Sequence, residues 1–136
     1  MTLAEVVVAM AITGLAVGGI VTGYIYSTTS AEKAGYHLVA NARAMERIEE
    51  VRSAQWVTTG STNLVDYLVA TNFPSKVVTN DLSGSGAGVV TATLNTYITQ
   101  VSTNPPLKRI RVDCIWKFKG VETITNTIET LRAPDQ

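Results

Sequence analysis

The stretch MTLAEVVVAMAITGLAVGGIVTGYIYS, residues 1–27, decides the class of this protein. From Leu3 to about Tyr26 it is apolar apart from one carboxylate, Glu5, and the next charged side chain is Glu32. A run of about 20 apolar residues is what a helix needs to cross the hydrocarbon core of a membrane. The run is longer than the core of a secretory signal peptide, no basic stretch stands before it, and the helical pattern continues beyond it. We therefore expect a retained helix and not a cleaved signal.

The helical pattern continues through AEKAGYHLVANARAMERIEEVRSAQW, residues 31–56. Apolar residues recur at steps of three and four, which predicts one buried stripe on an amphipathic helix. That stripe comprises Leu38, Ala42, Met45, Ile48 or Glu49, and Val51 or Arg52, and the rest of the cylinder carries Arg43, Glu46, Arg47 and Glu50. No proline occurs before Pro74. The sequence therefore predicts one long helix from about residue 2 to about residue 55, apolar in its first half and amphipathic in its second.

After the helix the pattern changes to that of strands. Residues 58–63 (TTGSTN) are typical of a helix exit loop, residues 63–76 predict a short helical or irregular turn, and residues 83–88 (SGSGAG) predict a flexible loop. Residues 89–101, 107–118 and 121–131 are rich in threonine and β-branched residues and predict three antiparallel strands. Turns at TNPP and Lys119-Gly120 separate them, and the middle strand places on one face Ile110, Val112, Cys114, Trp116 and Phe118.

The predicted fold class is α+β, with the long N-terminal helix packed on a small three-stranded antiparallel sheet. We expect residues 1–30 to form a hydrophobic transmembrane helix and residues 31–136 to form a globular head. The 136 residues suit one head domain, and 11 basic against 11 acidic residues give no indication of nucleic-acid binding.

Chemistry-bearing residues are sparse. His37 has no metal-ligand partner at suitable spacing, Cys114 is expected to be a small buried apolar residue, and Asp81 near Ser83 and Ser85 offers too few carboxylates for calcium. No Ser/His/Asp set or poised carboxylate pair occurs in the sequence. We therefore expect no enzyme activity, no cofactor and no metal. Tyr24, Tyr26 and Tyr36 are interpreted as interfacial anchors or packing groups between subunits.

The first turn, Met1-Thr2-Leu3-Ala4-Glu5, resembles the start of a mature type IV pilin or pseudopilin. The resemblance is specific over residues 1–26, and beyond them only the architecture is similar. It implies that a prepilin peptidase cuts just before Met1 and methylates the new amino group. The start Glu-Val-x-Val-Ala and the strand KRIRVDCIWK are more similar to the minor pilin branch than to major pilins. Two features that many members of the family have are absent. Thr22 stands near the place where they carry a proline in the helix, and the single cysteine, Cys114, cannot form their C-terminal disulfide.

The resemblance favours a functional role for Glu5. From the residues alone, its carboxylate either favours the helix macrodipole and reaches the headgroup layer, or serves a function at hydrocarbon depth. The resemblance implies that Glu5 pairs with the α-amino group of Met1 in the neighbouring subunit of a filament, with Thr2 and Leu3 completing the assembly segment.

Four glycines interrupt the apolar helix, each unfavourable by about 1 kcal/mol relative to alanine. The four glycines are Gly14, Gly18, Gly19 and Gly23. They form two small-xxx-small pairs and allow either close helix packing or local melting on assembly. We expect a melted or stretched segment over residues 14–23.

The resulting functional prediction is a structural subunit of an extracellular type IV pilus-like filament. The chain would reside in the bacterial inner membrane before assembly and on the cell surface afterwards. The resemblance implies as partners other copies of the chain, a prepilin peptidase, and an inner-membrane platform with its assembly ATPase. The main alternative is a minor pilin or type II secretion pseudopilin at a filament tip, and a third possibility is a membrane-anchored binding module.

Overall fold

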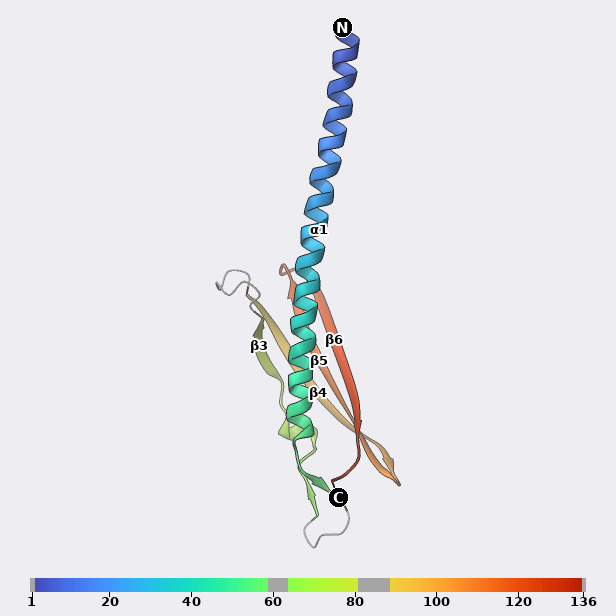
Figure 1. The fold of residues 1–136 in the computed structure, drawn as a ribbon. Coiled ribbons are helices and arrows are strands. Elements are labelled where there is room, and N and C mark those ends of the chain that lie inside the picture. Colours follow the sequence, from blue (N-terminus) through green and yellow to red (C-terminus); the bar gives the residue numbers. More distant parts are fainter. Residues whose placement is uncertain (1, 59–63, 81–88, 136) are drawn as a thin grey trace. The chain divides into compact units, whose positions relative to one another are not determined.

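The computed structural model describes residues 2–58, 64–80 and 89–135 (Figure 1). The predicted SGSGAG loop and all but the first residue of the predicted TTGSTN loop lie outside these ranges. The chain divides into two compact units, residues 1–35 and 36–136.

One helix, α1, runs from Leu3–Arg52 without interruption and confirms the predicted long N-terminal helix. Its end lies a few residues before the expected position near residue 55. The amide of Ser53 still donates to the carbonyl of Glu49 at 3.0 Å, and the amide of Ala54 donates to the carbonyl of Val51 at 3.2 Å. The Ala54 bond joins residues three apart in the chain and not four, which is the tighter pairing typical of a final helical turn.

Within the described residues, six strands follow the helix, so the α+β class is confirmed, but the prediction of a three-stranded sheet was too small. A four-stranded antiparallel sheet has the order β3-β4-β5-β6, and a separate antiparallel pair consists of β1 and β2. The bounds are β1 Trp56–Val57, β2 Val65–Asp66, β3 Lys76–Asn80, β4 Val90–Thr103, β5 Pro106–Phe118 and β6 Glu122–Arg132, with a short 3-10 helix, η1, at Ala70–Asn72.

The strands that the sequence missed are short. β1 and β2 have two residues each, and β3 has five. Alternation cannot be recognised over two residues, because a strand signal needs about four to eight. The three long strands were all predicted, and they pair as a meander in which Leu94 lies opposite Cys114 and Cys114 lies opposite Asn126.

The turn between β5 and β6 lies at Lys119-Gly120, as predicted. Both residues have positive φ, 48° and 73° respectively, and the amide of Val121 donates to the carbonyl of Phe118 at 3.0 Å. Positive φ at both central positions suits the twist of a hairpin, and glycine adopts it without steric cost.

The main core lies between the C-terminal part of α1 and one face of the sheet, and here the predicted stripe was wrong. Leu38 is 72% exposed, Met45 is 50% exposed and Ala42 is also exposed. The residues that face the sheet instead are Tyr36, Ala40, Ala44, Arg47, Ile48 and Val51. Only Ile48 and Val51 were correctly expected on the buried side.

Sheet residues with large rings explain this choice of face. Trp116 and Phe118 on β5 project toward α1, where Tyr36 lies 5.6 Å and 6.2 Å from them between ring centroids. The fully buried Ala40 and Ala44 belong to the same cluster and leave room for these rings. Tyr36 is therefore a core residue, which corrects its interpretation as an interfacial or inter-subunit side chain. The rest of the predicted inward face of β5 is confirmed as buried: Ile110, Val112 and Cys114.

Arg47 is a second correction, because it was expected on the solvated side of the helix and is buried. Its guanidinium donates to Thr96 Oγ1 at 3.1 Å, to Glu50 Oε2 at 2.7 Å and to the carbonyl of Pro74 at 2.8 Å. A buried charge is tolerated when its donors are satisfied in this way. Arg47 thereby connects α1 to β4 and to the segment before β3.

Candidate functional site

The first turn of α1 is closed by a reciprocal pair of contacts between Thr2 and Glu5. The Thr2 amide donates to Glu5 Oε2 at 2.8 Å, and the Glu5 amide approaches Thr2 Oγ1 at 3.4 Å. Thr2 thus stands at the N-cap and Glu5 three residues later, which is the arrangement of a capping box. The pattern Thr-x-x-Glu before an apolar run is the sequence signal for this contact.

The capping contact gives Glu5 a role within its own chain, in addition to the role expected between chains. A carboxylate offers about four lone-pair positions on its two oxygens, so a bond to the Thr2 amide leaves further capacity to accept. The same bond fixes the carboxylate at the end of the helix. Met1, the other member of the predicted ion pair, lies outside the described residues, so the pairing remains a prediction.

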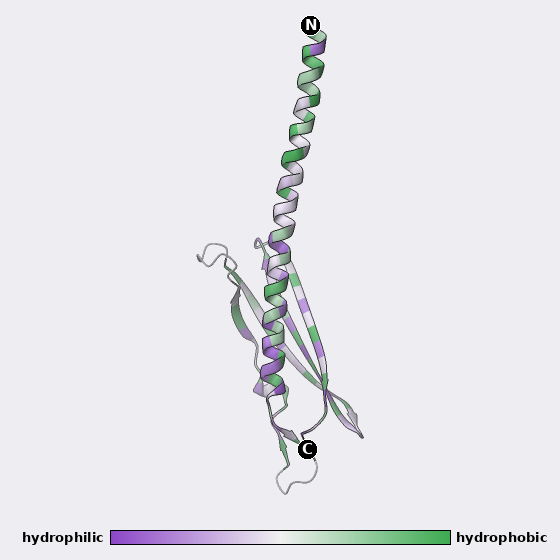
Figure 2. Ribbon diagram, in the orientation of Figure 1, coloured by the Kyte–Doolittle hydropathy of each residue, from purple (hydrophilic) through white to green (hydrophobic). Residues whose placement is uncertain are grey.

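The surface around Glu5 is apolar on every side. Each residue from 2 to 28 is exposed in the single chain, and Figure 2 shows that apolar residues dominate the first part of α1. α1 contains a stretch long and apolar enough to cross a membrane. Glu5 is the only formally charged side chain in the sequence before Glu32. A large apolar surface with one carboxylate is the feature that a function must explain.

The four glycines lie within this exposed part of α1. A Cβ built on any of them meets nothing within 4 Å apart from the adjacent residues and the neighbouring helical backbone, so no packing contact within the chain requires glycine there. Threonine hydroxyls nearby donate to backbone carbonyls, from Thr13 to Ala9 at 2.8 Å and from Thr22 to Gly18 at 2.9 Å. Helix α1 is unbroken over residues 14–23 in the single chain. The predicted melting concerns the assembled filament and stays a prediction.

In the head, His37 lies in a polar network that joins α1 to β5 and β6. Trp116 Nε1 donates to Asn126 Oδ1 at 2.9 Å, which orients the amide so that its nitrogen faces Asn41 Oδ1 at 2.9 Å and His37 Nδ1 at 3.2 Å. Because an indole nitrogen can only donate, this orientation makes Nδ1 of His37 an acceptor. The network aligns the helix on the sheet and resembles no catalytic arrangement.

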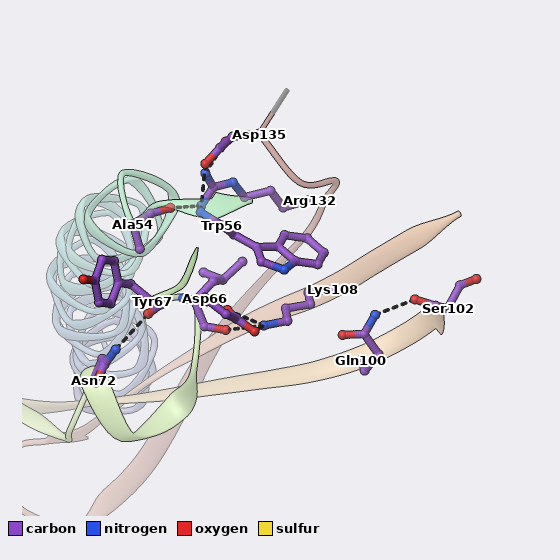
Figure 3. A network of polar contacts seen from close by, with 11 residues as sticks. Ala54, Trp56, Asp66, Tyr67, Asn72, Gln100, Ser102, Lys108, Arg132 and Asp135 are labelled. Carbon is purple, nitrogen blue, oxygen red and sulfur yellow. Dashed lines mark hydrogen bonds and ion pairs between the residues drawn. The ribbon is translucent and has the colours of Figure 1, made fainter. Parts of the chain in front are cut away.

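A second polar network holds β1, β2 and the C-terminal segment together (Figure 3). Lys108 Nζ contacts both carboxylate oxygens of Asp66 at 2.7 and 2.6 Å and the carbonyl of Leu68 at 2.7 Å, and it lies 4.8 Å from the ring centre of Trp56. Asp135 accepts from the Trp56 amide at 2.9 Å, and its own amide donates to the Trp56 carbonyl at 2.7 Å. The contacts of Lys108 with Asp66 and Leu68 join segments about 40 residues apart in the chain, and those between Trp56 and Asp135 join segments about 80 residues apart.

The Asp135 carboxylate belongs to this network as an acceptor on both oxygens. The backbone hydrogen bond from Trp56, followed by the hydrogen bond from Arg132, lowers the pKa of Asp135. Arg132 also donates to the carbonyl of Ala54. The C-terminal segment is therefore held at β1 by backbone and charged contacts.

Cys114 is buried in the main core, as predicted, and burial raises the pKa of its thiol. A buried thiol of raised pKa is a poor nucleophile. No group of three or more His, Cys, Asp or Glu residues suited to a metal ion occurs within residues 2–58, 64–80 and 89–135. Asp81, Ser83 and Ser85 lie outside those ranges.

Comparisons of the chain with protein-family models, with curated proteins and with solved structures gave no match. The function is therefore inferred from the chain's own residues. The feature with the most specific chemistry is the N-terminal surface formed by the exposed apolar part of α1 together with Thr2 and Glu5.

Proposed function

We propose that this chain is a structural subunit of an extracellular type IV pilus-like filament. The observation that carries the proposal is the N-terminal surface: a helix apolar on all sides with a single carboxylate in its first turn. The helix would hold the chain in the bacterial inner membrane until it is transferred into a bundle of identical helices. The heads would then form the outside of the filament.

Glu5 would set the register between neighbouring copies. An unpaired carboxylate at hydrocarbon depth costs roughly 2.5–3.5 kcal/mol on insertion scales. The α-amino group of Met1 in the next copy carries the opposite charge, and only a correctly staggered neighbour presents it. Removing one member of a buried ion pair costs about 3–5 kcal/mol, so a misplaced neighbour would be strongly disfavoured. Methylation of that amino group, which the resemblance implies, would leave its positive charge in place.

The capping contact permits a sharp test of this idea. Glu5→Gln removes the charge, but a glutamine at the same position still accepts from the Thr2 amide and preserves the capping box. Thr2→Ala keeps the charge and removes the threonine hydroxyl, at a cost of about 0.5–2 kcal/mol in the helix. If the ion pair directs assembly, Glu5→Gln chains remain in the membrane and form no filaments, whereas Thr2→Ala chains, which keep the charge, form more filaments than Glu5→Gln chains. Normal filament number and length in Glu5→Gln would refute the pairing.

The abundance of the chain in sheared surface filaments decides between the major subunit and its alternatives. Mass spectrometry of such filaments should find this chain as the dominant component, beginning at a methylated Met1. A trace amount would favour the minor pilin or pseudopilin, which the first turn and the strand KRIRVDCIWK resemble. A chain confined to the membrane fraction while filaments form would favour the membrane-anchored binding module.

A further inference from the structure

A second exposed apolar surface lies on α1 within the head. Leu38, Ala42 and Met45 are separated by four and three residues, so they lie on one face of the helix, and all three are exposed. We call them the outer stripe. The sheet-facing side of the same segment is occupied by Tyr36, Ala40 and Ala44. The helix therefore carries two apolar faces, of which the fold buries one.

The outer stripe is also free of charge. The ion pair between Arg43 and Glu46, 2.8 Å long, lies on the flank of the helix between the outer stripe and the sheet. Glu49 lies on the same face one turn beyond Met45, outside the outer stripe, and pairs with Arg52 at 3.0 Å. Over the two turns from Leu38 to Met45 the stripe can therefore be dehydrated without removing a charge from water.

The exposed part of α1 offers a surface of matching shape. Val6, Ala9, Met10 and Thr13 line a shallow apolar hollow. Their spacing, i, i+3, i+4 and i+7, is that of the four residues that form a hole in knobs-into-holes packing of helices. The hydroxyl of Thr13 already donates to the carbonyl of Ala9, so covering the hollow leaves no unsatisfied polar group there.

We propose that the outer stripe of one copy packs against this hollow on a second copy of the chain. The inference rests on the proposed function, and it assigns a specific helix-to-helix contact to the filament. Leu38 is the knob, and Met45, seven residues later, enters the next hole along the same helix. The helices run parallel, because every copy would enter the filament from the same membrane in the same orientation.

A second copy is the occupant because it supplies what the stripe requires. The partner surface must be an uncharged helix with a side-chain repeat of seven residues, and residues 6–13 of this chain provide one. The outer stripe and the proposed assembly surface also belong to the same helix, α1. A contact between them therefore extends the helix packing of the proposed filament onto the head.

Cysteine cross-linking in assembled filaments tests the contact directly. The sole native cysteine, Cys114, is fully buried, so engineered cysteines can be oxidised without interference. Filaments of a Met10→Cys/Leu38→Cys variant, or of Val17→Cys/Met45→Cys, in which Val17 is the equivalent position seven residues further along, should give ladders of cross-linked chains on a non-reducing gel. Met10→Cys/Arg43→Cys is the matched control, because Arg43 lies on another side of the helix and is also accessible, and it should give none. Absence of a ladder in both test variants, an equal ladder in the control, or a cross-link to any other protein would overturn the proposal.

A charge substitution tests whether the contact matters for assembly. Leu38→Asp should reduce filament protein by about tenfold or more, because the carboxylate would be dehydrated without a partner. Val121→Asp, in the β5–β6 turn and 88% exposed, is the matched control and should assemble normally. Unchanged filament yield in Leu38→Asp would overturn this inference and leave the proposed function standing. Failure of the unsubstituted chain to form filaments would instead remove the proposed function, and the inference with it.

Discussion

The ion pair between Lys108 and Asp66 predicts which of two substitutions destabilises the fold more, because one partner is buried and the other is half-exposed. The two side chains form a 2.6 Å ion pair, but the Lys108 side chain is 8% exposed and that of Asp66 is 45% exposed. Removing one partner leaves the other charge where it is. The two substitutions should therefore have unequal costs, although they break the same pair.

Asp66→Ala leaves the buried ammonium of Lys108 with only the Leu68 carbonyl and the face of Trp56. Leaving an uncompensated buried charge costs about 3–5 kcal/mol. Lys108→Met retains the apolar stem, and the half-exposed Asp66 regains water. Its main cost is the unsatisfied carbonyl of the buried Leu68, about 1–3 kcal/mol. Asp66→Ala should therefore be the more destabilising of the two.

Urea unfolding of the full chain in detergent micelles, followed by tryptophan fluorescence, measures both costs. The double variant should cost less than the sum of the single variants, because Lys108→Met removes the charge that Asp66→Ala strands. Glu49→Ala, which breaks a pair exposed on both sides, is the control and should change the free energy of unfolding by less than about 1 kcal/mol. A larger cost for Lys108→Met than for Asp66→Ala, or additive costs in the double variant, would refute the reasoning.

Three further predictions concern the head and the N-terminal helix. Burial raises the pKa of Asp113, but hydrogen bonds from Arg111 and Thr127 outweigh burial and lower that pKa overall. The ionised Asp113 carboxylate therefore stabilises the folded chain above about pH 3.9, the pKa of an unperturbed aspartate. This stabilisation is lost as the pH falls through the pKa of Asp113 in the folded state. The cost of Asp113→Asn, about 1.5–3 kcal/mol at pH 7, should accordingly shrink in urea titrations at pH 3. Ala40→Leu should lower stability by about 1–3 kcal/mol through overpacking, whereas thermal unfolding of Ala42→Leu, at an exposed position, should be nearly unchanged. Alanine in place of each N-terminal glycine should stabilise the helix by about 1 kcal/mol and, if the glycines weaken it for assembly, reduce filament yield; unchanged yield from the fourfold variant would contradict the melting of residues 14–23.

The long elements were predictable because their signals are local. α1 and the three long strands each contain enough residues to show a period, and the Lys119-Gly120 turn carries its own glycine signal. The buried charges were not predictable in this way. Arg47 finds partners at Pro74 and Thr96, and Lys108 finds Asp66 about 40 residues earlier in the chain. A charged residue in a sequence indicates solvent exposure unless a distant partner is known.

The candidate site was predicted in part. The sequence singled out Glu5 as the unusual residue of the apolar segment, and the structure places it in the first turn as expected. Its bond to the Thr2 amide was missed although the Thr-x-x-Glu pattern lies within four residues. The outer stripe was recognised as apolar and given the wrong location.

The sequence by itself determined that about the first fifty residues form one helix, that the first half of this helix is apolar on all sides, and that a meander of long strands follows. Only the tertiary structure decided which apolar face of the helix is buried. Periodicity shows that Leu38 and Met45 share a face, and that Ala40 and Ala44 share another, but both faces are apolar. Trp116 and Phe118 on the sheet fill the space above β5, so the helix approaches with its small residues and leaves its large ones outside. Shape complementarity between elements about 70 to 80 residues apart in the chain makes that choice, and no local pattern encodes it.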